Sequence, residues 1–323
     1  MSYQMFLKHI AALVDQRMPD RTVEIHQVQK NNSVVLDGLT IRKPGSRISP
    51  TIYLNSYYDE YDAGRDLDDI VDEISMIYEQ NQNDEMIEED FFQDFSKVRR
   101  KIVYKLVNTA LNRGMLRNVP SVPVLDLSMV FYYIFDMGDD VCGTVLIQNH
   151  HLESWGVDET VICRYAKRNT PLVLPPTMIS MDSVMKDFLE SAFYRQMMDA
   201  DVLRESGDND QEKLEQMISL LVERIPLEAD HEMFVLTNQR KYFGAAVLLY
   251  PELLKRIAER LDRDLYILPS SVHEAILVPD TGEFMLEDLS RFVRRVNLTE
   301  VEKEERLSNH AYLFRRKDGC ISF

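Results

Sequence analysis

Cysteines, glycines, prolines and long apolar runs are all scarce in this chain of 323 residues, and each shortage excludes a class of protein. The three cysteines lie far apart without a CxxC pair, which excludes an evident zinc ribbon or thioredoxin-like motif and fits a reducing compartment. The 11 glycines and 12 prolines form no low-complexity tract, so broad disorder is not expected. The longest apolar run, Met129 to Phe135, is far shorter than the roughly 20 residues of a membrane helix.

Several motifs that carry chemistry are also missing from the sequence. It has no GxxxxGK[ST] phosphate loop, no GxGxxG fingerprint, no HExxH pair and no kinase signature. The acidic stretch "DEYDAGRDLDD" lacks the regular ligand spacing of a calcium loop. The opening residues lack the regions of a signal peptide. We therefore expect a cytoplasmic protein with no cofactor, no bound metal and no membrane association.

The net charge of −17 is concentrated in one segment. Asp59 to Asp94 holds 15 acidic residues and one basic residue, Arg65, whereas the rest of the chain holds 39 acids and 36 bases. A surface that tracks nucleic-acid phosphates needs the opposite sign, so direct nucleic-acid binding is not expected. A basic protein is the partner that this segment favours.

The periodicity of apolar residues predicts an α+β protein with mixed, mainly antiparallel sheets built from hairpins, and with helices against their faces. In Asp66 to Gln80 the apolar residues follow helical spacing and predict a helix. The acids Asp68, Asp69, Asp72 and Glu73 then lie on the face exposed to solvent. We expect a helix or helix pair over Glu88 to Asn118, although "KIVYKLV" within it also fits a strand. Further expected elements are a helix over Tyr3 to Met18, a hairpin across Asn31-Asn32, a strand and short turn in "PTIYLNSYY", a hairpin from "LDLSMVFYYIF" and "VCGTVLIQ", and a hairpin from "MFVLTN" and "GAAVLLY".

Two lobes are expected, residues 1–198 and 214–323, joined by the polar linker Asp199 to Lys213. The two lobes contain similar series of hairpin, helix, strand and proline, in which Gly143 aligns with Gly244 and Pro175 with Pro269. This pattern raises the hypothesis of a duplicated unit, since repeated supersecondary units leave such a trace.

The stretch "NHHLESWG" brings two adjacent histidines, His150 and His151, close to the only tryptophan, Trp155. Adjacent side chains diverge in both strands and helices, so at most one of these histidines can bind a given ion. The alternative is a connector between a strand and a helix, with Asn149 and Asp158 as helix caps and Gly156 as the bend. Local composition favours the connector, and a catalytic role stays open.

The stretch "LPSSVHE" is the second candidate cluster. If the chain is extended there, Ser271 and His273 share a face, which would bring a hydroxyl and an imidazole together beside Glu274. No GxSxG elbow accompanies them, and a serine-rich turn between two strands explains the same residues.

Four phrases, "VVLDGLTIR", "SPTIYLNSYYDEYDAG", "NHHLESWGV" and "LYILPSSVHEAILVPD", resemble a domain-of-unknown-function family of clostridial gut bacteria. The similarity runs over nearly the whole chain. It implies a bacterial cytoplasmic protein and brings no assigned activity, cofactor or catalytic residue.

Two functions are consistent with these observations. The first is a non-enzymatic interaction protein that binds a basic partner through its acidic segment, with Asp66, Asp68, Asp69, Asp72 and Glu73 as the binding residues. The alternative is a hydrolase or metal-dependent enzyme whose site lies between the two candidate clusters, with His150, His151, Ser271, His273 and Glu274 as the candidate residues.

Overall fold

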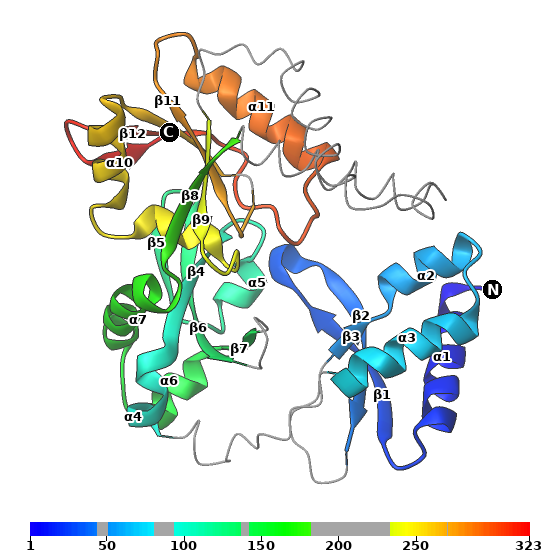
Figure 1. Ribbon diagram of the computed structural model, residues 1–323. Coiled ribbons are helices and arrows are strands. Elements are labelled where there is room, and N and C mark those ends of the chain that lie inside the picture. The colour runs from blue at the N-terminus through cyan, green and yellow to red at the C-terminus, as the bar shows by residue number, and fades with distance from the viewer. Residues whose placement is uncertain (44–50, 81–93, 137–141, 182–232, 270) are drawn as a thin grey trace, which may run out of the picture. The chain divides into compact units, whose positions relative to one another are not determined.

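The computed structural model describes residues 1–43, 51–80, 94–136, 142–181, 233–269 and 271–323 (Figure 1). These residues divide into two compact units, Met1–Asn169 with Lys303–Glu305 and Thr170–Glu302 with Arg306–Phe323. All strand pairs in the described ranges are antiparallel, and helices flank the sheets, which confirms the α+β class. The predicted linker, Asp199 to Lys213, lies outside the described residues.

The first unit begins with a three-stranded sheet and three helices. The strands are β1 (Thr22–Gln29), β2 (Val35–Arg42) and β3 (Thr51–Tyr53), and the helices are α1 (Tyr3–Arg17), α2 (Asn55–Asp62) and α3 (Leu67–Gln80). As predicted, β1 and β2 form a hairpin whose turn includes Asn32 at a φ of 56°, a conformation that asparagine tolerates. Figure 1 shows α1 and α3 side by side next to β1, and their buried residues join those of the sheet in one core.

Helix α2 replaces the short turn that we expected after the strand in "PTIYLNSYY". The strand ends at Tyr53 and the helix begins two residues later. Leu54, Tyr57, Tyr58 and Tyr61 follow helical spacing, and all of them pack into the same core. The tyrosines favour strands by intrinsic propensity, and tertiary packing overrides that preference.

A second sheet in the first unit is centred on β6 (Leu127–Asp136). Strand β4 (Ile102–Asn108) pairs along one side of β6, while β5 (Ser121–Val124) and β7 (Cys142–Leu146) pair along the other. For "KIVYKLV", the prediction of a helix within Glu88 to Asn118 was therefore wrong. The alternative prediction of a strand is confirmed. Six consecutive residues of β4 are buried, as expected where both faces of a strand are covered.

Four short helical segments and one longer helix, α7, surround this second sheet. They are α4 (Phe95–Val98), the 3-10 turn η2 (Arg99–Lys101), α5 (Arg113–Leu116), α6 (Asn149–Trp155) and α7 (Glu159–Val173). Asn169 of α7 donates hydrogen bonds to the carbonyl oxygens of Arg99 and Ile102, which ties this helix to the start of β4.

The second unit contains a six-stranded sheet in the order β13-β12-β10-β11-β9-β8. Its strands are β8 (Pro176–Ser180), β9 (Phe234–Asn238), β10 (Leu265–Leu268), β11 (Ala275–Pro279), β12 (Tyr312–Arg315) and β13 (Cys320–Ser322). Its helical elements are the 3-10 helix η4 (Gly244–Leu249), α10 (Leu253–Leu261) and α11 (Leu286–Thr299). Leu289 and Val293 of α11 pack with Tyr266 and Val278 of the sheet.

The hairpin predicted from "MFVLTN" and "GAAVLLY" does not form, because "GAAVLL" is the 3-10 helix η4. All residues from Gly244 to Leu248 are buried, and a short continuous apolar run cannot distinguish a core strand from a buried helical turn. The hypothesis of a duplicated unit required this hairpin in the second lobe, so it is wrong as well. Gly143 lies in β7 and Gly244 in η4, while Pro175 precedes strand β8 and Pro269 follows strand β10.

Cys320 is exposed and Cys163 is only partly buried, so neither of these two cysteines belongs to the core. Within the described ranges, no helix has both the length and the apolar content needed to cross a bilayer.

Candidate functional site

The histidine pair lies in α6, the short helix that connects β7 to α7. Gln148 is the N-cap of this helix, so the prediction that Asn149 caps it was wrong by one residue. The side chain of Asn149 instead donates to the carbonyl of Arg117. Gly156 ends the helix at a φ of 64°, and Asp158 accepts the backbone N–H of Val161 at the start of α7. These two contacts are the bend and the cap predicted for a connector.

His151 completes the cap of α6. The backbone N–H of Gln148 donates to Nδ1 of His151 over 3.0 Å, while the backbone of His151 donates to the Gln148 side chain, which makes a reciprocal capping box. Since Nδ1 accepts a hydrogen bond, the neutral ring carries its proton on Nε2, and neither nitrogen then offers a lone pair to a metal ion. Burial, with a smaller contribution from His150, lowers the pKa of His151 to about 4.

Trp155 lies between His151 and Phe95, with ring centroids 5.6 Å from each. The tryptophan thus covers the junction of the helix with α4. His150 is exposed, and its ring centroid lies 4.0 Å from that of His151. The contacts of this cluster fix the local fold, and a catalytic role for His150 or His151 stays a prediction.

The second cluster forms a turn between β10 and β11, so the extended conformation assumed for it was wrong. The backbone N–H of His273 donates to Oγ of Ser271 over 3.0 Å, and the backbone N–H of Ser271 donates to the carbonyl of Glu274. Ser271 is buried, and its hydroxyl oxygen already serves the turn. The carbonyl of His273 accepts the hydroxyl of Thr237 in the neighbouring strand. These contacts match the serine-rich turn that was the alternative to a nucleophile.

The two clusters belong to different compact units. A site shared by His150 or His151 with Ser271, His273 and Glu274 therefore stays a prediction. Among the residues that the structure describes, no group of three or more His, Cys, Asp or Glu side chains is placed to hold a metal ion.

The predicted acidic binding residues all lie on α3 or at its start, away from the buried stripe of Ile70, Val71, Ile74 and Tyr78. Asp68 and Asp72 pair with Arg17 of α1, Asp68 at 3.9 Å. Glu73 accepts hydrogen bonds from Arg65 over 2.5 Å and from the hydroxyl of Tyr57 over 3.0 Å, and the contact with Arg65 is the main cause that lowers the pKa of this carboxyl. Three of the five acids thus bind cations of the chain itself.

The remaining two, Asp66 and Asp69, are exposed and form no ion pair with any described residue. Asp66 caps α3, since its Oδ1 accepts the backbone N–H of Asp68 over 2.8 Å. Asp59 and Asp62 of α2 are likewise exposed, without an ion pair in the part of the chain that the structure describes. We name these four residues the free acidic face.

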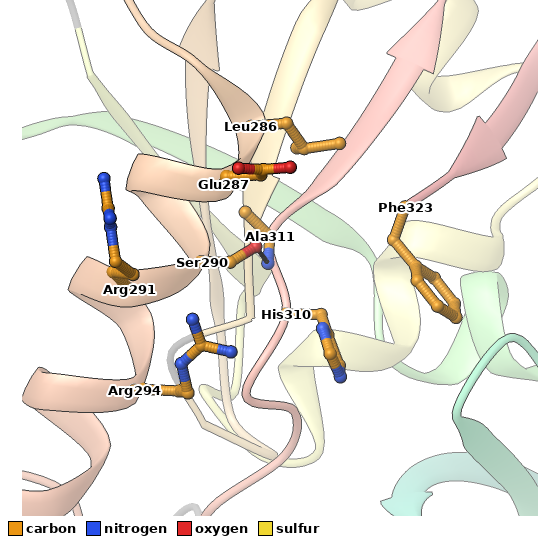
Figure 2. A pocket seen from close by; sticks show the side chains of 8 residues that line it. All are labelled: Leu286, Glu287, Ser290, Arg291, Arg294, His310, Ala311 and Phe323. Atoms are coloured by element: carbon orange, nitrogen blue, oxygen red, sulfur yellow. Dashed lines mark hydrogen bonds between the residues drawn. The ribbon is translucent and has the colours of Figure 1, made fainter.

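A pocket in the second unit was missed by the sequence interpretation (Figure 2). Arg291 and Arg294 come from α11, while His310 and Phe323 come from separate segments near the end of the chain. The sequence contains a weak sign of it, two arginines at i and i+3 on a helix, but nothing that links them to His310 or Phe323.

Together these features define an α+β protein of antiparallel sheets, with an acidic helical face in one unit and a pocket with arginines in the other. The chain belongs to the Family of unknown function (DUF5688), whose profile matches residues 3–316. This match confirms the resemblance to a family without an assigned activity. No curated protein and no solved structure matches the chain.

Proposed function

We propose that the protein is a non-enzymatic binding protein that engages a basic protein partner through the free acidic face. The observation that carries the proposal is that Asp59, Asp62, Asp66 and Asp69 are all exposed, and that no cation in the described residues pairs with them. Because no cation neutralises these carboxylates, their negative potential extends into solvent. This potential attracts a cationic protein surface and raises its rate of association with the chain.

The acids that form ion pairs link neighbouring helices. Arg17 links α1 to α3 through Asp68 and Asp72, and Arg65 joins Glu60 of α2 to Glu73 of α3. These pairs hold the helices that carry the free acidic face. The predicted set of five binding residues therefore divides into Asp66 and Asp69, which face a partner, and Asp68, Asp72 and Glu73, which fix the helices.

Exposed ion pairs contribute about 0.2–1 kcal/mol each, so several must form together for useful affinity. Four carboxylates, two on α2, one on α3 and one at the cap of α3, meet this requirement for a partner with clustered lysine or arginine side chains. The same weakness predicts strong dependence on salt, because exposed charges are screened within about 8 Å at physiological ionic strength.

The proposal is tested by titrating the full chain with a fluorescent oligolysine peptide at increasing sodium chloride concentrations. We expect saturable binding at low salt and an affinity that falls steeply as the salt concentration rises, while an oligoglutamate peptide of the same length does not bind. An affinity independent of salt, or no oligolysine binding at low salt, would contradict the proposal.

A further inference from the structure

The pocket in the second unit has a volume of about 300 Å³ and the composition of a small-molecule site. Figure 2 shows α11 on one side with Arg291 and Arg294, and His310 and Phe323 on the other. Cavities of this size accept small organic ligands, and such sites combine apolar walls with a few polar groups. The lining residues are Leu286, Glu287, Ser290, Arg291, Arg294, His310, Ala311 and Phe323.

Ser290 provides a buried hydroxyl at the pocket, since only 9% of this residue is exposed. Its Oγ accepts the backbone N–H of Ala311 over 3.0 Å, and that bond uses an oxygen lone pair and leaves the hydroxyl proton available. Because Ser290 lines the pocket, a ligand atom that accepts a hydrogen bond can bind this hydroxyl.

Arg294 provides the positive charge. Its guanidinium forms no ion pair with any carboxylate in the described ranges, whereas Arg291 on the preceding turn pairs with Asp288. The guanidinium fork matches a carboxylate with two parallel hydrogen bonds. Arg294 and Ser290 are four residues apart on α11, so their side chains lie on the same face of the helix.

Glu287 indicates which way an anion would lie in the pocket. It belongs to the first turn of α11, seven residues before Arg294, which is a rise of about 10 Å along the helix. A ligand carboxylate is repelled at the Glu287 end and attracted at the Arg294 end. The anionic group therefore belongs beside Arg294 and Ser290.

The rings of Phe323 and His310 form an aromatic surface on one side of the pocket. Their rings stack with centroids 5.3 Å apart and an interplanar angle of 22°, and Phe323 is 57% exposed. Leu286 and Ala311 add apolar surface to the lining. An exposed aromatic ring at a pocket can stack in an offset arrangement against the ring of a ligand.

We propose that this pocket binds a small aromatic carboxylate, with the carboxylate on Arg294 and Ser290 and the ring against Phe323. This inference goes beyond the proposed function, because it concerns a different unit and a ligand of the opposite charge. Neither proposal depends on the other.

The test uses N-acetylphenylalanine as the probe and its neutral amide as the matched ligand, with binding measured by calorimetry or by ligand-observed NMR. We expect the acid to bind saturably and the amide to bind about tenfold more weakly, since a hydrogen bond to a charged group is stronger than one to a neutral group. Equal binding of the two, or no saturable binding of the acid, would overturn the proposal.

Variants of α11 then locate the site. Arg294→Gln should weaken binding of the acid about tenfold and leave binding of the amide nearly unchanged. Arg295→Gln is the matched control, because Arg295 is exposed on the same helix, its guanidinium lies over the ring of Phe292, and it does not line the pocket. If the two variants bind the acid equally, the ligand is not held by Arg294 and the proposed site is wrong.

Discussion

Gly244 lies against the backbone of His273 so closely that no larger residue fits. A Cβ atom added to Gly244 would lie 1.9 Å from the carbonyl oxygen of His273 and equally close to Oγ1 of Thr237. The hydroxyl of Thr237 also donates to that carbonyl over 2.7 Å, so η4, β9 and the turn before β11 meet at one point. The turn that contains Ser271 and His273 is therefore fixed by packing.

We predict that Gly244→Ala lowers the free energy of unfolding by about 3 kcal/mol, because the new methyl group would overlap both the backbone carbonyl of His273 and the Thr237 hydroxyl that is bonded to it. Gly114→Ala is the control, since a Cβ there would meet only the side chain of Gln29 at 4.0 Å. Chemical denaturation of both variants measures the difference. Equal stability of the two would show that the contact at His273 is not as tight as described.

Lys105 is a buried cation in the middle of β4. It is 9% exposed, its Nζ lies 4.8 Å from the centroid of the Tyr132 ring, and burial followed by the charge of Lys30 lowers its pKa to about 8. Because the unfolded chain holds this proton up to an ordinary pKa of 10.5, the folded state loses stability as the pH falls through this range. The cost is fully present below pH 8.

Lys105→Met should therefore raise the free energy of unfolding at pH 7, by up to about 3 kcal/mol for a pKa difference of this size. The gain should shrink as the pH rises from 8 to above 10, where the wild-type lysine is neutral in both states. Urea titrations at several pH values measure it. A variant that is less stable than wild type at pH 7 would show that the charge is well compensated.

Titration of His151 makes the free energy of unfolding depend on pH in the acidic range as well. Its pKa is lowered from 6.5 to about 4, so it contributes stability above pH 6.5 that is lost as the pH falls through 4. In His151→Gln the capping box is kept, since glutamine at this position accepts the same backbone hydrogen bond, but the side chain cannot titrate.

We expect wild type to lose about 2 kcal/mol more than His151→Gln between pH 6.5 and 4, after allowance for the partial exposure of the ring. His150→Gln is the matched control, because His150 is exposed and accepts no capping hydrogen bond in the described contacts. Parallel acid titrations by circular dichroism give the comparison. If His150→Gln flattens the pH dependence as much as His151→Gln, the cap does not involve His151.

The fold was predictable where one periodicity dominated a segment. The stripe of Ile70, Val71, Ile74 and Tyr78 predicted α3 and the exposure of its acids, and the apolar runs on either side of residues 137–141 predicted the pairing of β6 with β7. Helix α2 was missed because its apolar positions are tyrosines, and η4 because its apolar run has no period. In both cases tertiary packing decides the conformation. The helical spacing of the tyrosines was outweighed by their preference for strands, and the run in η4 has no period to read.

The candidate sites were less predictable than the fold. Whether an acid is free depends on distant cations: Arg17 lies about 50 residues before Asp68 and Asp72 in the chain, and only the packing of α1 on α3 brings them together. The pocket likewise needs α11, His310 and Phe323 to converge. Local spacing predicts which residues share one helix face, and it does not predict which elements meet.

The free acidic face is tested most directly by comparing two double variants of α3 that remove the same charge. Asp66→Asn with Asp69→Asn removes acids that have no cation partner among the described residues, whereas Asp68→Asn with Asp72→Asn removes acids paired with Arg17. Titration with oligolysine at fixed low salt should show a loss of affinity of about tenfold in the first pair and a clearly smaller loss in the second. Equal losses in both, or none in either, would contradict binding through the free acidic face.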